Sequence, residues 1–139
     1  MPRVLISDEL SPNATGIFES RGLKVDRKIG LTLEQLLSEI ESYDGLAIRS
    51  ATKVTAEVIA KAKNLKVVGR AGIGVDNIAV DAASAAGVVV MNTPFGNAVT
   101  TAEHAISMIC SLAREITTAD RSTQAGKWEK SSFMGTELT

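Results

Sequence analysis

Short, continuously apolar runs alternate with segments of helical periodicity along most of this chain, and this alternation limits its fold more than any other feature. The apolar runs are residues 3–7, 23–25, 45–48, 65–69 and 88–91. A strand that is apolar throughout is buried on both faces, and parallel neighbours require a crossover that a helix usually supplies. The sequence therefore predicts an α/β fold with a doubly wound parallel sheet of about five strands.

Helix boundary signals stand between the apolar runs. Thr32 with Gln35 has the spacing of a capping box, in which each side chain bonds the backbone amide of the other residue. Thr100 with Glu103 has the same spacing, and apolar residues then recur at three- and four-residue steps. This pattern predicts one long amphipathic helix of about 20 residues that starts near Thr100.

Composition and charge exclude several classes of function. The 139 residues carry a formal net charge of -1, so no broad positive field would attract nucleic acid or an anionic membrane. Cys110 is the single cysteine, which excludes an internal disulfide and favours a reducing compartment, so we expect a cytoplasmic protein. The sequence contains no run of about 18 apolar residues, so it predicts no membrane span. We also expect no metal site.

In a parallel sheet, ligands bind beyond the carboxyl ends of the strands, so the loops that follow the strands are the candidate sites. The first such loop is Arg49-Ser50-Ala51-Thr52. Its guanidinium can hold a carboxylate or a phosphate, and its hydroxyls and backbone amides can complete an anion site. The same residues could instead be a solvated cation followed by ordinary turn and helix-capping residues.

The second candidate loop, residues 69–77, is rich in glycine. Gly72 and Gly74 would let backbone amides approach an anionic group, or would allow a positive φ. A dinucleotide fingerprint is rejected, because Asn77 stands where its third glycine is expected and no acidic residue follows at the required distance. The alternative to an anion site is a tight turn in which Asp76 or Asn77 bonds its own backbone.

The third candidate loop, residues 92–97, precedes the long helix. Asn97 could present its amide to a ligand, while Pro94 and Gly96 shape the connection. This segment could equally be a simple loop.

Together, the order and spacing of these blocks carry a resemblance to a known family. The chain resembles the N-terminal part of the NAD-dependent D-2-hydroxyacid dehydrogenases in four blocks: Arg49-Ser50-Ala51-Thr52, the glycine block at residues 69–77, Asn92-Thr93-Pro94-Phe95-Gly96-Asn97 and Thr101-Ala102-Glu103-His104. The resemblance covers nearly the whole chain, and the third block resembles the phosphoglycerate branch in particular. It implies a flavodoxin-like substrate-binding domain with strand order 2-1-3-4-5.

The resemblance also implies substrate-binding residues, namely Arg49, Ser50, Gly72, Ile73, Gly74 and Asn97. Arg49 would contact the substrate phosphate, and the amides of residues 72–74 would face the substrate carboxylate near the nicotinamide. Asn97 would lie on the substrate side of an interdomain hinge. The family often has a hydroxyl residue in place of Ile73, so only a backbone contact and a weak contact with the cofactor carry over there.

The implied reaction is hydride transfer between NAD and 3-phosphoglycerate or 3-phosphohydroxypyruvate, the first step of serine biosynthesis. The family's catalytic arginine and its histidine with a supporting carboxylate have no match in this chain, and its glycine-rich nucleotide loop would begin after Thr139. His104 is expected to be a surface or interface residue, because a lone helical histidine usually has no catalytic partner. We therefore expect no catalytic residue here, and no dehydrogenase activity from these 139 residues alone.

The expected organisation is a substrate-binding domain over residues 1–97, followed by an interdomain helix and arm over residues 98–139. The arm would lead to a nucleotide-binding domain that is absent from the chain. The resemblance also implies a homo-oligomer formed through the helix and arm. Two alternatives remain: another member such as a glyoxylate or hydroxypyruvate reductase, which needs no phosphate contact, or a non-enzymatic, corepressor-like scaffold of the same superfamily.

Overall fold

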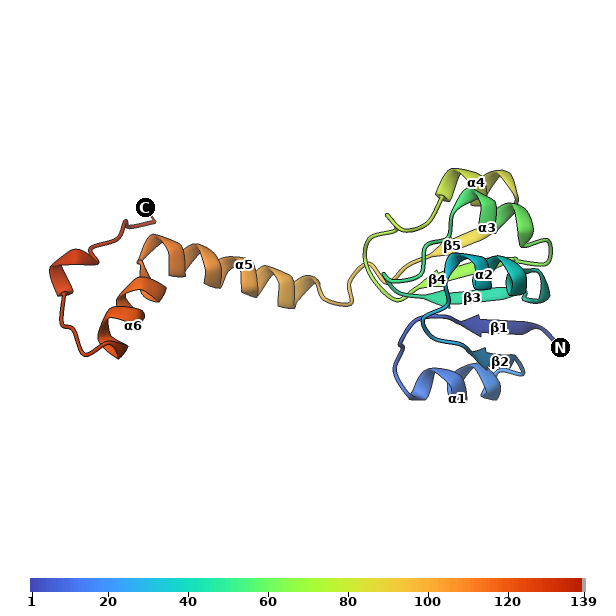
Figure 1. Ribbon diagram of the computed structural model, residues 1–139, viewed down its shortest axis with the longest axis horizontal. Helices are drawn as coiled ribbons and strands as arrows, with labels where there is room; N and C mark the ends of the chain where they lie inside the picture. The colour runs from blue at the N-terminus through green and yellow to red at the C-terminus, as the bar shows by residue number, and fades with distance from the viewer. Residues whose placement is uncertain (139) are drawn as a thin grey trace. The chain divides into compact units, whose positions relative to one another are not determined.

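The computed structural model describes residues 1–138, and the chain divides into two compact units between Gly96 and Asn97. The first unit is a parallel sheet with the strand order β2-β1-β3-β4-β5 (Figure 1). Its strands are β1 (Arg3–Ile6), β2 (Lys24–Arg27), β3 (Gly45–Ile48), β4 (Val67–Arg70) and β5 (Val89–Met91). Every pairing between neighbours is parallel. The predicted α/β class, five strands and flavodoxin-like order are thus confirmed.

Helices cover both faces of this sheet (Figure 1). One face carries α2 (Leu33–Glu39), the short 3-10 helix η1 (Ile40–Ser42), α3 (Ala56–Lys61) and α4 (Val80–Ala85), and the other carries α1 (Asn13–Ser20). The larger core cluster lies under α2, α3 and α4 and includes the fully buried Leu5, Val58, Val68 and Ala83. Burial of these side chains is the main source of stability for the first unit.

The face that carries α1 is only partly covered. Phe18 of α1 packs near Val4 and Ala47, at the β1 side of the sheet. Towards β4 and β5 the face opens into an apolar groove of about 410 Å³, which Val67 and Met91 help to line. No helix of the first unit packs over that part of the described sheet.

The start of α2 follows the predicted capping box. Thr32 Oγ1 accepts a hydrogen bond from the Gln35 amide at 3.2 Å, and Gln35 Oε1 accepts one from the Thr32 amide at 2.9 Å. The two side chains thereby satisfy backbone donors that the first helical turn leaves without a partner. This boundary was predictable because both partners are close in sequence.

The second unit contains α5 (Ala98–Ala113), α6 (Ile116–Gln124) and the 3-10 helix η2 (Lys130–Ser132). The predicted helix near Thr100 is present as α5, but its 16 residues are fewer than the expected 20 or so, and the predicted capping box is wrong. Asn97 takes the N-cap position, so Thr100 lies inside α5 and no box with Glu103 forms. Ala98 and Val99 can continue the helical turn, and this moves the start before Thr100.

The long helix is interrupted at Glu115, which adopts a left-handed backbone with φ of 53°. The following segment folds back onto the end of α5, where the Ala113 carbonyl accepts a hydrogen bond from the Thr136 amide at 2.6 Å. That bond satisfies a carbonyl which the helix leaves free at its C-terminus. Among the described residues, no helix has both the length and the apolar character needed to cross a membrane.

Candidate anion-binding site

The loops after β3 and β4 lie side by side at the carboxyl edge of the sheet. Ile48 and Arg70 are paired in the parallel register, and the Ala71 amide donates to the Ile48 carbonyl at 2.8 Å. The segments that follow, residues 49–52 and residues 72–74, therefore leave the sheet next to each other. These segments belong to the first and the second of the three loops that sequence analysis singled out.

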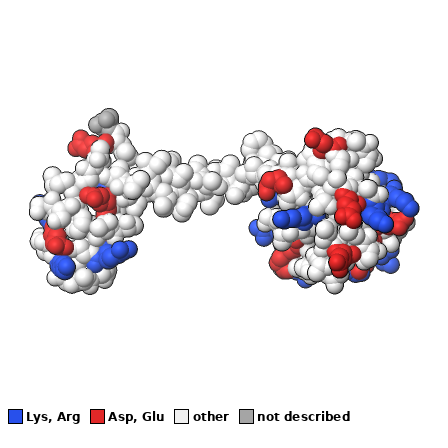
Figure 2. All heavy atoms as spheres, turned by 45° about the horizontal axis from the view of Figure 1, so that its top comes forward, with Lys and Arg blue, Asp and Glu red and all other residues white. Residues whose placement is uncertain are grey.

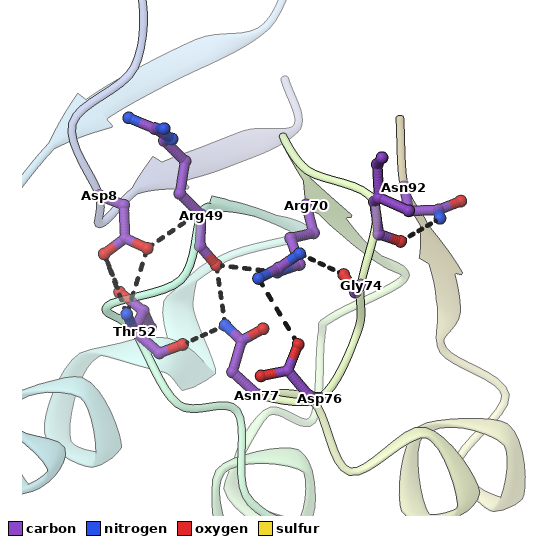
Figure 3. A network of polar contacts seen from close by, with 9 residues as sticks. Asp8, Arg49, Thr52, Arg70, Gly74, Asp76, Asn77 and Asn92 are labelled. Carbon is purple, nitrogen blue, oxygen red and sulfur yellow. Dashed lines mark hydrogen bonds and ion pairs between the residues drawn. The ribbon is translucent and has the colours of Figure 1, made fainter. Parts of the chain in front are cut away.

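Arg70 links these two loops (Figure 3). Its Nε donates to the Arg49 carbonyl at 3.3 Å, and its Nη1 donates to the Gly74 carbonyl. Its Nη2 lies 3.7 Å from Asp76 Oδ1, and the side chain is only 10% exposed. Sequence analysis assigned Arg70 no role, although an arginine at the end of an apolar strand and just before two glycines is a signal that could have indicated one.

The glycines leave space for this guanidinium. A Cβ atom at residue 72 would lie 2.7 Å from Arg70 Nη1, and one at residue 74 would lie 2.8 Å from Asp76 Oδ1. Neither glycine has a positive φ. Of the two roles considered for these glycines, the positive φ is therefore wrong, and the requirement at residue 72 is steric.

The turn at residues 49–52 is held by Asp8 and Asn77 (Figure 3). The buried Asp8 carboxylate accepts hydrogen bonds from the Arg49 and Thr52 amides, while Asn77 Nδ2 donates to the carbonyls of the same two residues. The turn alternative supposed that Asn77 bonds its own backbone. Its side chain instead bonds the loop of residues 49–52. Thr52 does not cap α3, because Thr55 is the N-cap.

Arg49 itself is available to a ligand. Its side chain points away from Arg70 and Asn77 (Figure 3), it is exposed, and it makes no side-chain hydrogen bond or ion pair within residues 1–138. Ser50 is exposed beside it. On the face drawn in Figure 2, Lys and Arg are interspersed with Asp and Glu over the first unit, so attraction of an anion would be local.

The third loop begins against the second. Asn92 Nδ2 donates to the Ile73 carbonyl at 2.7 Å, and the Thr93 amide donates to the Gly72 carbonyl at 2.9 Å. The Ile73 side chain is 42% exposed. Asn97 belongs to the second unit, where its carbonyl accepts from the Thr101 amide at 2.9 Å. Five of the six predicted site residues therefore share two adjoining loops of the first unit.

The remaining polar candidates form no further cluster. His104 lies exposed on α5. Within residues 1–138, no three or more His, Cys, Asp or Glu side chains are grouped as a metal site would require. The function that the residues at the carboxyl edge of the sheet can perform is the binding of an anion.

Comparison with known proteins identifies a family for this chain. The family model described as D-isomer specific 2-hydroxyacid dehydrogenase, catalytic domain, matches residues 4–137. Over 136 residues the chain is 49% identical to a D-3-phosphoglycerate dehydrogenase of Archaeoglobus fulgidus and 52% identical to that of Homo sapiens. Each alignment covers 98% of this chain but 26% of the relative, so the chain spans about a quarter of their length.

A solved structure is similar over most of the chain. It is described as a cofactor (NAD+) bound 3-phosphoglycerate dehydrogenase in Entamoeba histolytica, with a TM-score of 0.70 and 30% identity. The match covers 81% of this chain and 39% of that one. On the family model and these relatives, the chain belongs to the D-isomer specific 2-hydroxyacid dehydrogenase family.

Proposed function

We propose that this chain is the N-terminal, substrate-binding part of an NAD-dependent D-3-phosphoglycerate dehydrogenase, which acts in serine biosynthesis in the cytoplasm. The relatives that share about half of its residues bear that name. The observation that carries the proposal is that two loops adjoin at the carboxyl edge of the sheet: the loop of Arg49, whose guanidinium has no partner within residues 1–138, and the loop of residues 72–74, which Arg70 links to it. Residues 1–97 would be the substrate domain, and residues 98–139 the helix and arm towards a nucleotide-binding domain.

In this proposal the chain binds and orients the substrate. Arg49 and Ser50 bind the phosphate, since a guanidinium offers two parallel donors to an anion. The backbone amides of Ile73 and Gly74 face the carboxylate, while a substrate contact of Asn97 stays a prediction from the resemblance. These groups would hold C2 of the substrate in place for a reaction whose acid and base lie on another part of the protein.

NAD, when bound, would accept or return the hydride at C2. The residues of this chain fit only a small part of that cofactor. The exposed Ile73 side chain suits the apolar face of a nicotinamide ring, whereas the loop of residues 72–77 lacks the form of a pyrophosphate site. The Arg70 guanidinium occupies the space beside Gly72 in this loop. The chain should therefore bind substrate on its own but not turn it over.

Titration of the isotope-labelled chain with D-3-phosphoglycerate tests this function by nuclear magnetic resonance. We expect saturable shifts of the backbone amides at residues 49–52 and 72–74. D-glycerate, which lacks the phosphate, should bind at least about ten-fold more weakly, the loss typical of one charged contact. An Arg49→Gln variant should lose this preference, and Arg21→Gln, a change of an exposed arginine after α1, is the matched control.

The outcomes separate the alternatives. Equal binding of D-glycerate and D-3-phosphoglycerate would indicate a reductase of unphosphorylated acids in place of the phosphoglycerate enzyme. No binding of any small acid would favour a scaffold. Turnover of NAD with phosphoglycerate by this chain alone would contradict the assignment of its acid and base to another part of the protein.

We also propose that the second unit forms a homo-oligomer. Apolar side chains of α5, α6 and the arm are more than half exposed, among them Ile106, Met108, Leu112, Ile116 and Trp128. Aromatic and aliphatic residues of this kind are enriched in the centres of protein interfaces.

A further inference from the structure

We propose that Asp8 and Asn77 are positioning residues that pre-form an anion-binding turn at residues 49–52, and that the Ser50 and Ala51 backbone amides bind the anionic end of the substrate. The identity of that substrate rests on the proposed function, whereas the geometry of the turn is independent of it.

Asp8 fixes the N–H groups at the two ends of the turn. Its Oδ2 accepts from the Arg49 amide at 2.7 Å, and Oδ1 and Oδ2 accept from the Thr52 amide at 3.0 and 3.1 Å. Oδ1 also accepts from Thr52 Oγ1 at 2.6 Å. The side chain is buried, with the residue only 4% exposed, and Asp8 makes no ion pair within residues 1–138. Backbone and hydroxyl donors from the turn therefore offset the cost of burying this carboxylate.

Asn77 fixes the carbonyl groups of the same two residues. Its Nδ2 donates to the Arg49 carbonyl at 2.8 Å and to the Thr52 carbonyl at 2.7 Å. Arg70 Nε adds a second bond to the Arg49 carbonyl. Because Asp8 holds the amides and Asn77 holds the carbonyls, both ends of the turn are fixed from two sides (Figure 3).

This arrangement leaves the backbone amides in the middle of the turn without a hydrogen-bond acceptor among residues 1–138. Ser50 and Ala51 are exposed, and their amides donate no hydrogen bond within the described chain. Successive free amides on an ordered turn form a concave site for an anion. The Arg49 guanidinium is carried by the same turn and supplies the positive charge. A turn that is already ordered costs less entropy on binding than a mobile one.

An Asp8→Asn variant of the 139-residue chain tests the amide side of this arrangement. Asparagine keeps the shape but can accept with only one oxygen. We expect hydrogen exchange of the Arg49 and Thr52 amides, from which Asp8 accepts, to become about ten-fold faster, and D-3-phosphoglycerate to bind about ten-fold more weakly. The ligand shifts at residues 72–74 should persist at saturation, which a general loss of structure would not allow.

Asn77→Ala tests the carbonyl side and keeps the proposal falsifiable if Asp8→Asn does not fold. It should produce the same local increase in exchange. Asp44→Asn is the matched control, because Asp44 also accepts from a backbone amide, that of Arg3 at 2.9 Å, but precedes β3 at the opposite edge of the sheet. It should leave exchange at residues 49–52 and ligand affinity unchanged.

Unchanged exchange and affinity in both Asp8→Asn and Asn77→Ala would overturn the positioning role, whatever ligand the chain binds. Binding of inorganic phosphate at Ser50 and Ala51, without preference for D-3-phosphoglycerate, would support the turn and contradict the proposed function. Binding of D-3-phosphoglycerate without shifts at the Ser50 and Ala51 amides would overturn the anion-binding turn and leave the proposed function in place.

Discussion

At the residue scale, adding a Cβ atom has different consequences at Gly72 and at Gly74. The atom nearest to a Cβ at residue 72 belongs to the Arg70 guanidinium, which is nearly buried and held by several contacts. The atom nearest to a Cβ at residue 74 belongs to Asp76, whose side chain is 84% exposed. An exposed carboxylate can rotate away, whereas the held guanidinium cannot move without losing its bonds.

We therefore expect Gly72→Ala to lower the free energy of unfolding by about 1–3 kcal/mol, the usual range for overpacking. Gly74→Ala should change it by less than about 0.5 kcal/mol, as surface substitutions do. Denaturant unfolding of the two variants measures both values. Equal costs would mean that Arg70 yields as readily as Asp76, and would contradict its role as a fixed link between the loops.

At the element scale, β1 and β3 are tied together at their amino ends by a carboxylate. Asp44 Oδ2 accepts from the Arg3 amide at 2.9 Å, and Oδ1 lies 3.1 Å from Lys66 Nζ. The backbone hydrogen bond from Arg3, followed by the bond from Lys66, lowers the pKa of Asp44 below its usual value of 3.8. A lowered pKa in the folded state means that the ionised form stabilises the fold.

Because the folded pKa of Asp44 is below the unfolded one, its contribution is complete above about pH 4 and is lost as the pH falls through the folded value. Asp44→Asn should therefore be less stable than the unchanged chain at neutral pH. The difference in unfolding free energy should shrink as the pH falls below about 4. Urea unfolding at several pH values measures this, and a difference that stays constant into strong acid would show that ionisation is not its source.

The same scale shows how much the sequence could predict. Strands β1 and β3 were predictable because burial on both faces requires continuous apolar residues, and the Thr32 cap was predictable because its partner is three residues away. The position of α5 near Thr100 was predicted, but the Thr100 capping box was wrong, because the capping pattern does not reveal that the preceding residues extend the helix. In the site, the loops carrying Arg49 and Gly72 were singled out. The roles of Asp8 and Arg70 were not, since they depend on partners that only the folded sheet brings near.

At the scale of the whole molecule, the two units differ in what they bury. Within residues 1–138, all the buried core residues lie in the first unit, between Val4 and Val88. Helices α5 and α6 contain no buried residue. Since helices in proteins depend mainly on tertiary packing, α5 lacks within its own unit most of the contacts that usually stabilise a helix of this length.

If the second unit forms the proposed homo-oligomer, the protection of α5 must depend on protein concentration. We expect its amide exchange to slow as the concentration rises, while exchange in the central strands stays constant, because mass action stabilises only what association buries. Ile109→Glu should abolish this dependence and give a monomeric mass in sedimentation. Ile17→Glu on α1 is the matched control, because Ile109 is 54% exposed and Ile17 is 58% exposed. A monomer at high concentration, or equal effects of the two variants, would contradict an interface on α5.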